Sequence, residues 1–224
     1  MHEQKPVHYI TTLNDVREVM LSGYADLGYW TRHLAGSTLL PFNRNGQAEM
    51  LLSATDSRYM GRPFNELSVS LAVCQAAEPA QQSGFYLAYA FNSSAMFAFI
   101  ERVMFKTPYY QGTIQLENRA PVMMEVCRKN DRLLWASMGA ERPHTPAQSL
   151  EEDWRGRIYL AGGKRYFLAR LAGLTQTCPF LAGQDNLEIT PGGNPGLTWL
   201  KESNFTPHEW RIRARATHAR SETY

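Results

Sequence analysis

The segment from Phe64 to Val73 constrains the fold more than any other part of the chain, because apolar and polar residues alternate along it. One face of the extended strand carries leucine and valine side chains, from Leu67 to Val73, and the other carries Glu66 and two serines. In an open sheet the polar face is solvated and Glu66 has no special role. In a closed barrel the same face lines an internal cavity, where burial raises the pKa of a carboxyl group and suits it to acid–base chemistry.

Strand-like segments recur along the rest of the chain. The other predicted strands are residues 49–54, 84–91, 111–116, 122–129, 132–138, 164–175, 184–190 and 211–218. Helices are predicted within residues 23–35, from a cap at Ser93 to near Lys106, and from the capping-box signature Ser149-x-x-Glu152 to about Leu160. This pattern predicts an α+β fold, with a mostly antiparallel, barrel-like sheet around an internal cavity and about three helices.

The composition places these elements in one packed domain over residues 1–224. Hydrophobic residues make up 44% of the chain and charged residues 20%, which is typical of a globular core. No apolar run approaches the roughly 18 residues of a membrane span, and no signal-peptide hydrophobic region follows the polar N-terminus. The net charge of +2 predicts neither a nucleic-acid nor a membrane partner. Cys74, Cys127 and Cys178 are odd in number and far apart, as expected for reduced thiols in a cytoplasmic protein.

Common catalytic motifs are missing from the sequence. It has no Walker-type loop, no G-x-G-x-x-G fingerprint, no G-x-S-x-G elbow and no H-E-x-x-H motif. The six histidines are scattered, and no two cysteines have the spacing of metal ligands. We therefore expect neither a metal nor a cofactor, and we look for chemistry among carboxylate, arginine, lysine and tyrosine side chains.

The predicted helix that begins near Ser93 is apolar nearly all round, which indicates that it is buried. Pro108 disfavours a helical conformation for the preceding residue, so the helix should end near Lys106. Lys106 has two interpretations. A lysine in the last turn is favoured by the helix dipole without any catalytic role. An amine buried among aromatic residues, one turn after Arg102, would instead have a lowered pKa and act as a Schiff-base nucleophile.

Tyr109 and Tyr110 follow the proline in an extended segment. Because successive side chains of such a segment point to opposite sides, at most one of the two phenols should face a cavity. Glu101 and Arg102 lie either at the exposed rim of the helix or paired inside, where an arginine is the usual binding group for a carboxylate or a phosphate. The arginines of the last predicted strand, residues 211–218, are interpreted as a solvated face.

The order of these motifs resembles the acetoacetate decarboxylase-like superfamily. The likeness extends over most of the segment from Tyr24 to Leu181 and is carried by the order and spacing of the motifs. The resemblance implies a mostly antiparallel, barrel-like fold around a cavity and a homo-oligomer. The matching segments are Phe64–Val69, Gly84–Leu87, Ser93–Arg102 and Phe105–Tyr110, and Leu150–Tyr159 with Arg165–Arg170 is most similar to an uncharacterised branch of the superfamily.

The resemblance also implies a site, from which this sequence departs. The decarboxylases of the superfamily use a pocket lysine that forms a Schiff base with a β-keto acid, and the lysine pair of their motif directly follows a proline. Here Tyr109 and Tyr110 follow Pro108, so the nucleophile is missing from its place. Lys106 lies two residues before the proline, and a two-residue shift along an extended chain moves a side chain by roughly 6–7 Å.

Two other positions match the pocket of that superfamily. A pocket glutamate of the family is matched by Glu66, and an arginine–glutamate pair is matched by Arg17 and Glu18. The candidate catalytic residues are Glu66, Tyr109, Tyr110 and Lys106, and the candidate substrate-binding residues are Arg102, Arg17, Asn65 and Phe105.

Three functions remain open at this point. The first is a lyase-type enzyme, namely a dehydratase, a cyclase or a decarboxylase that needs no imine, acting by acid–base chemistry on a small keto or hydroxy acid or a polyketide-like compound. The second is a non-catalytic small-molecule-binding protein that kept the cavity. The third is a Schiff-base lyase that uses Lys106.

Overall fold

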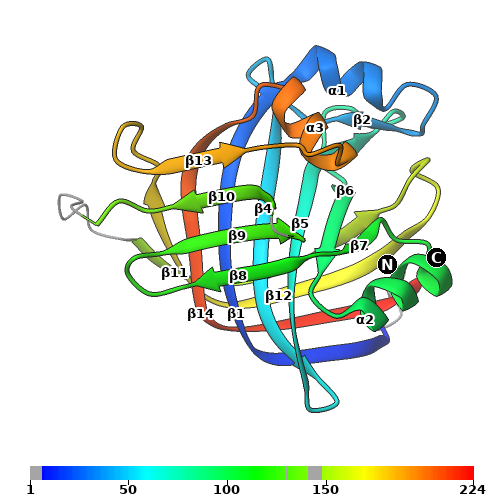
Figure 1. Cartoon of the computed structure of the whole chain (residues 1–224). Coiled ribbons are helices and arrows are strands. Elements are labelled where there is room, and N and C mark those ends of the chain that lie inside the picture. The colour runs from blue at the N-terminus through cyan, green and yellow to red at the C-terminus, as the bar shows by residue number, and fades with distance from the viewer. Residues whose placement is uncertain (1–6, 130, 141–147) are drawn as a thin grey trace.

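A closed ring of long strands forms the body of the protein in the computed structural model, which describes residues 7–129, 131–140 and 148–224 (Figure 1). Each strand pairs with the next, and the pairing of β5 with β6 closes the ring. All ring neighbours are antiparallel except β6 and β11, which are parallel. In ring order the strands are β1 (Tyr9–Asp26), β4 (Gln47–Tyr59), β5 (Arg62–Gln75), β6 (Gly84–Asn92), β11 (Gln148–Tyr159), β12 (Tyr166–Pro179) and β14 (Thr206–Thr223). Short strands extend it, namely β2 (Leu39–Pro41) beside β5, β3 (Asn43–Arg44) beside β4 and β7 (Tyr109–Gln111) beside β6.

A second, four-stranded antiparallel sheet lies against the outer face of this ring, in front of β1, β4 and β5 in Figure 1. The alternation of the ring strands explains the packing. The side chains of Val19, Leu52 and Val69 point outward from the ring. They pack in one core with Met124 and Leu134 of the second sheet. The main hydrophobic core therefore lies between the two sheets and not inside the ring. The strands of this sheet are β8 (Thr113–Glu117), β9 (Met123–Arg128), β10 (Asp131–Ser137) and β13 (Asn186–Ile189).

The helices are short and begin with polar caps. Asp26 caps α1 (Leu27–His33), and Asn194 caps α3 (Pro195–Glu202), by accepting a hydrogen bond from a backbone N–H of the first turn. The helix α2 (Ala95–Ile100) continues into a wider π-helical turn, η1 (Glu101–Phe105). It ends at Lys106, whose φ of 57° is left-handed, so the predicted end of this helix is confirmed.

The mostly antiparallel α+β barrel predicted from the sequence is confirmed, but one predicted helix is wrong. Residues 149–159 belong to strand β11. A capping box at Ser149 is a local signal worth only about 1 kcal/mol. It is overridden because β11 pairs with β12 along its whole length and turns Trp154 and Ile158 toward the interior of the ring. The third helix is instead α3, where the sequence indicates only a turn.

The helix formed by α2 and η1 also differs from its prediction. Its cap is Ser94 and not Ser93, since the Ser94 side chain accepts a hydrogen bond from a backbone N–H of the first turn. The hydroxyl of Ser93 accepts a hydrogen bond from the backbone N–H of Asn65 instead. The helix is not buried on all sides, because it lies at the rim of the ring, with one apolar face toward the interior and another toward solvent. Phe99 is 56% exposed and Met104 is 70% exposed.

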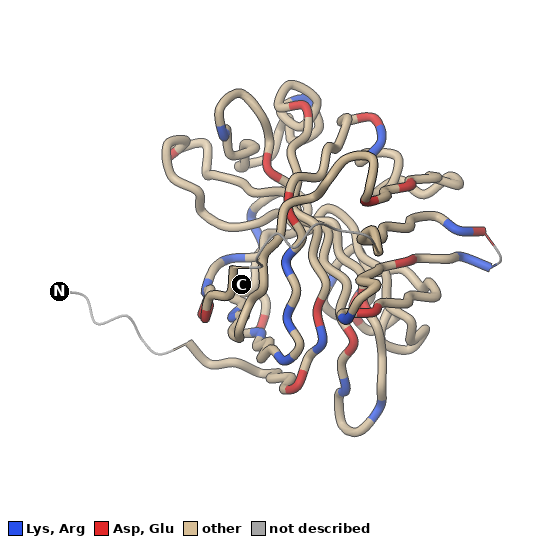
Figure 2. Tube along the Cα trace, turned by 90° about the vertical axis from the view of Figure 1, so that its left-hand side faces the viewer, with Lys and Arg blue, Asp and Glu red and all other residues tan. Residues whose placement is uncertain are grey.

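Two further properties bear on partners. Among the described residues, no helix is long and apolar enough to cross a membrane. Positive and negative residues are interspersed along the described part of the trace in Figure 2. The polar N-terminal residues 1–6 lie outside the described part of the chain.

Candidate active site

The ring encloses a cavity of about 870 Å³. The polar face of β5 turns into it, so that Glu66, Ser68 and Ser70 line the cavity while Leu67 and Val69 pack into the core outside. The alternation from Phe64 to Val73 therefore belongs to a barrel wall and not to a solvated sheet. Apolar side chains from β6, β11 and β12 cover much of the remaining wall, namely Phe85, Leu87, Trp154, Ile158, Phe167 and Leu171.

Glu66 is a carboxyl group in this cavity whose pKa is raised. Asn92, opposite Glu66 in the pairing of β5 with β6, donates a hydrogen bond to Oε1 at 2.8 Å. The hydroxyl of Tyr109 donates to Oε2 at 3.4 Å. Burial and the negative charge of Glu101 raise the pKa of Glu66 to about 7, against the opposing influence of Asn92 and Arg220. Burial also raises the pKa of Tyr109 well above its ordinary value, so its phenol stays protonated.

An ion pair between η1 and β14 lies in the same part of the cavity. Nη1 of Arg220 donates to both carboxylate oxygens of Glu101, at 2.7 and 2.9 Å, and the hydroxyl of Thr107 donates to Glu101 at 2.7 Å. The guanidinium group of Arg220 lies over the rings of Phe105 and Phe167, at 4.7 and 4.2 Å from their centroids. Arg220 is thus fixed by a carboxylate and two aromatic rings.

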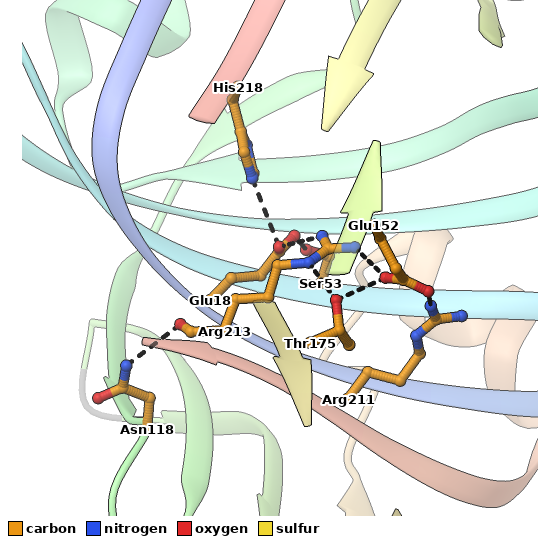
Figure 3. A network of polar contacts seen from close by, with 8 residues as sticks. All are labelled: Glu18, Ser53, Asn118, Glu152, Thr175, Arg211, Arg213 and His218. Carbon is orange, nitrogen blue, oxygen red and sulfur yellow. Dashed lines mark hydrogen bonds and ion pairs between the residues drawn. The ribbon is translucent and has the colours of Figure 1, made fainter. Parts of the chain in front are cut away.

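A second polar network joins five strands of the ring (Figure 3). Arg213, whose side chain is only 3% exposed, donates to Glu18 at 2.7 Å, to Glu152 at 2.5 Å and to the hydroxyl of Thr175 at 2.7 Å. Nε2 of His218 lies 3.4 Å from Oε2 of Glu18. Burial alone would raise the pKa of Glu18, but His218 and Arg213 lower it to about 2, so this buried group is a carboxylate.

Two bulges bring this network together. The register of β14 against both of its neighbours shifts by one residue between Arg213 and Ala216, and the register of β1 shifts around Asp15. An extra residue reverses which side chains face inward, so Arg213 before the bulge and His218 after it both line the cavity. The interpretation of the arginines in this strand as a solvated face is therefore wrong for Arg211 and Arg213, which both line the cavity. It holds for Arg215, whose side chain is 84% exposed.

The candidate residues of the helix and the following strand divide between two pockets. Tyr109 and Phe105 line the cavity with Glu66. Tyr110 and Arg102 line a separate pocket of about 540 Å³, where Tyr110 stacks on Tyr89 with ring centroids 4.7 Å apart. The expectation that at most one of the two tyrosines faces the cavity is met.

Three further candidate residues line neither pocket. Lys106 is exposed at the end of the helix. Arg17 forms an ion pair with Asp56, and Asn65 donates a hydrogen bond to the carbonyl oxygen of Ile114 at 2.9 Å. Strand alternation explains the last two positions, because each directly precedes a glutamate that faces the cavity, and its own side chain points the other way.

Several residues that line the cavity, among them Asn92 and His218, are not among the candidates predicted from the sequence, which also predicts a solvated position for Arg213. Asn92 ends the strand predicted over residues 84–91, so extending that strand by one residue would have included it. The inward direction of His218 and Arg220 depends on the bulge in β14, for which the sequence shows no clear signal. Among the described residues, no group of three or more His, Cys, Asp or Glu side chains is arranged to hold a metal ion.

Comparisons with known proteins agree with this architecture. No protein-family model and no curated protein matches the chain. The enduracididine biosynthesis enzyme MppR with HEPES bound matches with a TM-score of 0.60 and 11% identity, over 96% of this chain and 87% of that chain. An acetoacetate decarboxylase-like enzyme from Sphingomonas wittichii RW1 matches with a TM-score of 0.56 and 13% identity, over 99% of this chain and 96% of that chain. Acetoacetate decarboxylase from Legionella pneumophila matches with a TM-score of 0.58 and 11% identity, over 99% of this chain and 91% of that chain. The motif order and the structure thus agree, and the chain has the acetoacetate decarboxylase-like fold.

Proposed function

We propose that the protein is a lyase-type enzyme that acts by acid–base chemistry on a small keto or hydroxy acid or a polyketide-like compound. The observation that carries this proposal is Glu66, a carboxyl group in an 870 Å³ cavity with a pKa of about 7 and a hydrogen bond from Tyr109. A carboxyl group that titrates near neutral pH can both accept a proton and return it within one reaction cycle.

This pair of side chains suits reactions that pass through an enolate. In a dehydration, the Glu66 carboxylate takes the proton from the carbon beside the substrate carbonyl, and the Tyr109 hydroxyl donates a hydrogen bond to the enolate oxygen. Protonated Glu66 then returns its proton to the departing hydroxyl group, which leaves as water. In a decarboxylation, the carbon–carbon bond breaks to release CO₂, and protonated Glu66 gives its proton to the enolate carbon.

The structural neighbours support a carbonyl substrate. MppR has been solved in complex with pyruvate, and with the condensation product of pyruvate and imidazole 4-carboxaldehyde. The proposal does not use the imine route, because no lysine lines the cavity in the described part of the chain and Lys106 is exposed.

The proposal is tested by Glu66→Gln, which keeps the shape of the side chain and removes its ability to exchange protons. Turnover is measured on a panel of β-hydroxy, β-keto and 2-oxo acids and neutral polyketide-like ketones. We expect kcat to fall by about 100-fold or more. Ser68→Ala is the matched control, because Ser68 lines the cavity from the same face of β5 without being titratable near neutral pH.

Full turnover by a folded Glu66→Gln variant would contradict the assignment. The alternative of a binding protein that kept the cavity predicts a different result for the wild-type chain. In that case panel compounds raise its melting temperature in a saturable way, and no product forms with any of them.

A further inference from the structure

The apolar side chains on one side of the cavity form a cluster that is separate from the main core. Leu87 and Phe167 are buried in this cluster, and Trp154 and Ile158 pack against it. Ile158 lies opposite Phe167 on β12 and beside Phe85 on β6. The rings of Phe85 and Trp154 meet edge to face, with their centroids 5.7 Å apart. Together with Leu171 these residues form an apolar wall of the cavity, namely Phe85, Leu87, Trp154, Ile158, Phe167 and Leu171.

The protein covers this apolar wall only in part. Phe85, Trp154 and Ile158 line the cavity and are half-buried. The main core lies on the outer face of the ring, between the two sheets, and does not include them. An apolar group that packs on such side chains removes them from water and adds dispersion contacts.

The apolar wall adjoins the pair of residues proposed to act on the substrate. Tyr109, whose hydroxyl donates to Glu66, packs against the same apolar cluster. A carbonyl group bound at Glu66 and Tyr109 therefore has the apolar wall beside it, and the rest of the substrate can extend along that wall.

The size of the cavity fits an extended ligand. Its volume of about 870 Å³ lies in the upper part of the range of about 300–1,000 Å³ that is typical of pockets for drug-sized ligands. A three- or four-carbon acid is much smaller than such a ligand and would contact little of the apolar wall. A compound with several more carbons would reach across it.

We propose that the substrate carries an alkyl chain or aromatic group of several carbons, which packs on the apolar wall while the carbonyl group lies at Glu66 and Tyr109. This inference rests on the proposed function for the position of the carbonyl group, but not for the apolar contacts. It selects the polyketide-like end of the proposed substrate range over short keto acids.

The test measures binding by isothermal titration calorimetry along two series, the straight-chain 2-oxo acids from pyruvate to 2-oxodecanoate and the methyl ketones from acetone to 2-nonanone. We expect the affinity to rise by about two- to fourfold for each added methylene group, until the chain spans the cavity. An affinity that does not rise with chain length in either series would overturn the inference, as would the absence of binding by every compound.

Two substitutions locate the bound chain. Leu171→Trp adds a ring system beside Trp154, which lies opposite Leu171 in the pairing of β11 with β12. Because the added ring takes up space that the chain needs, binding of 2-oxodecanoate should weaken by about tenfold or more. Trp154→Ala removes an indole ring from the apolar wall and should lower the gain in affinity per methylene group.

Leu174→Trp is the matched control, because Leu174 lies on the same strand outside the cavity and is 51% exposed. It should bind both series as the wild-type protein does. Folded Leu171→Trp and Trp154→Ala variants that both keep the wild-type affinity for 2-oxodecanoate would also overturn the inference.

A failure of the proposed function gives a different result. If only that function fails, affinity rises with chain length but no compound is turned over. If only this inference fails, Glu66→Gln lowers the turnover of a compound whose binding does not depend on chain length.

Discussion

At the scale of single residues, the two adjacent tyrosines provide an internal comparison. Tyr109 donates a hydrogen bond to Glu66, whereas Tyr110 stacks on Tyr89 in the other pocket. If Tyr109 stabilises an enolate oxygen, Tyr109→Phe should lower kcat by about 100-fold, as the loss of one oxyanion donor does elsewhere. Tyr110→Phe should leave kcat within about twofold, since it removes no donor from the cavity. The measurement is steady-state kinetics on a substrate found with the panel of acids and ketones described above. Equal losses of kcat in both variants would contradict the assignment.

Lys106 provides a second comparison at this scale. Because its side chain is exposed at the end of the helix, it should form no Schiff base with a substrate in the cavity. We expect no mass increase on Lys106 when the protein is treated with borohydride in the presence of a keto acid that it binds. Lys106→Met should retain turnover. A borohydride-dependent adduct on Lys106, lost in the Met variant together with turnover, would restore the imine route.

The residues of the site differ in how far the sequence could predict them. Glu66 could be predicted, because its strand alternates without interruption and a two-residue period assigns each side chain to a face. Phe105 and Tyr109 could be predicted as site residues, because the predicted helix end at Lys106 lies between them. Arg220 could not be placed, because its direction depends on a bulge in β14 that has no local sequence signature.

At the scale of elements, Arg213 joins the strands that surround β14. It reaches Glu18 on β1, Glu152 on β11 and Thr175 on β12. Arg213→Leu would leave Glu18 and Glu152 with less compensating charge inside the ring. We expect the free energy of unfolding to fall by about 3–5 kcal/mol, the usual cost of removing one partner from a buried ion pair.

Urea denaturation measures this loss, and Arg215→Leu is the control. Its exposed position two residues further along β14 predicts a change within about 0.5 kcal/mol. Adding Glu18→Gln to the Arg213→Leu variant should recover part of the loss, because it removes the carboxylate that was left unpaired. Similar stabilities for Arg213→Leu and Arg215→Leu would show that the network contributes little to the ring.

Elements were predicted well where the local signal and the long-range pairing agree, as in β5 and β6. They were predicted wrongly where the two conflict. The capping box at Ser149 indicates a helix, but pairing with β12 and with β6 makes residues 148–159 a ring strand. A local signal does not contain the information that a partner strand is present, so only the assembled sheet decides such a segment.

At the scale of the whole molecule, the separation of core from cavity determines how stability depends on pH. The apolar core lies between the two sheets, so the inside of the ring can hold buried carboxyl groups in contrasting surroundings. Glu66 has a pKa of about 7, above its ordinary value of 4.5, and Glu18 has a pKa of about 2, below it. The stability that Glu18 contributes is present above pH 4.5 and is lost as the pH falls toward 2.

The stability that Glu66 contributes changes with pH in the opposite direction to that of Glu18. Because the folded state holds its proton more tightly than the unfolded state, its contribution is fully present below pH 4.5 and is lost as the pH rises through 7. The change amounts to roughly 3 kcal/mol. Glu66→Gln removes this titration, so its free energy of unfolding relative to the wild-type protein should rise by up to that amount between pH 5 and pH 8. Urea denaturation at both pH values measures the difference, and Ser68→Ala should show the same offset from wild type at each. A Glu66→Gln offset that does not change with pH would mean that Glu66 does not titrate near neutral pH, and the acid–base role proposed for it would lose its physical basis.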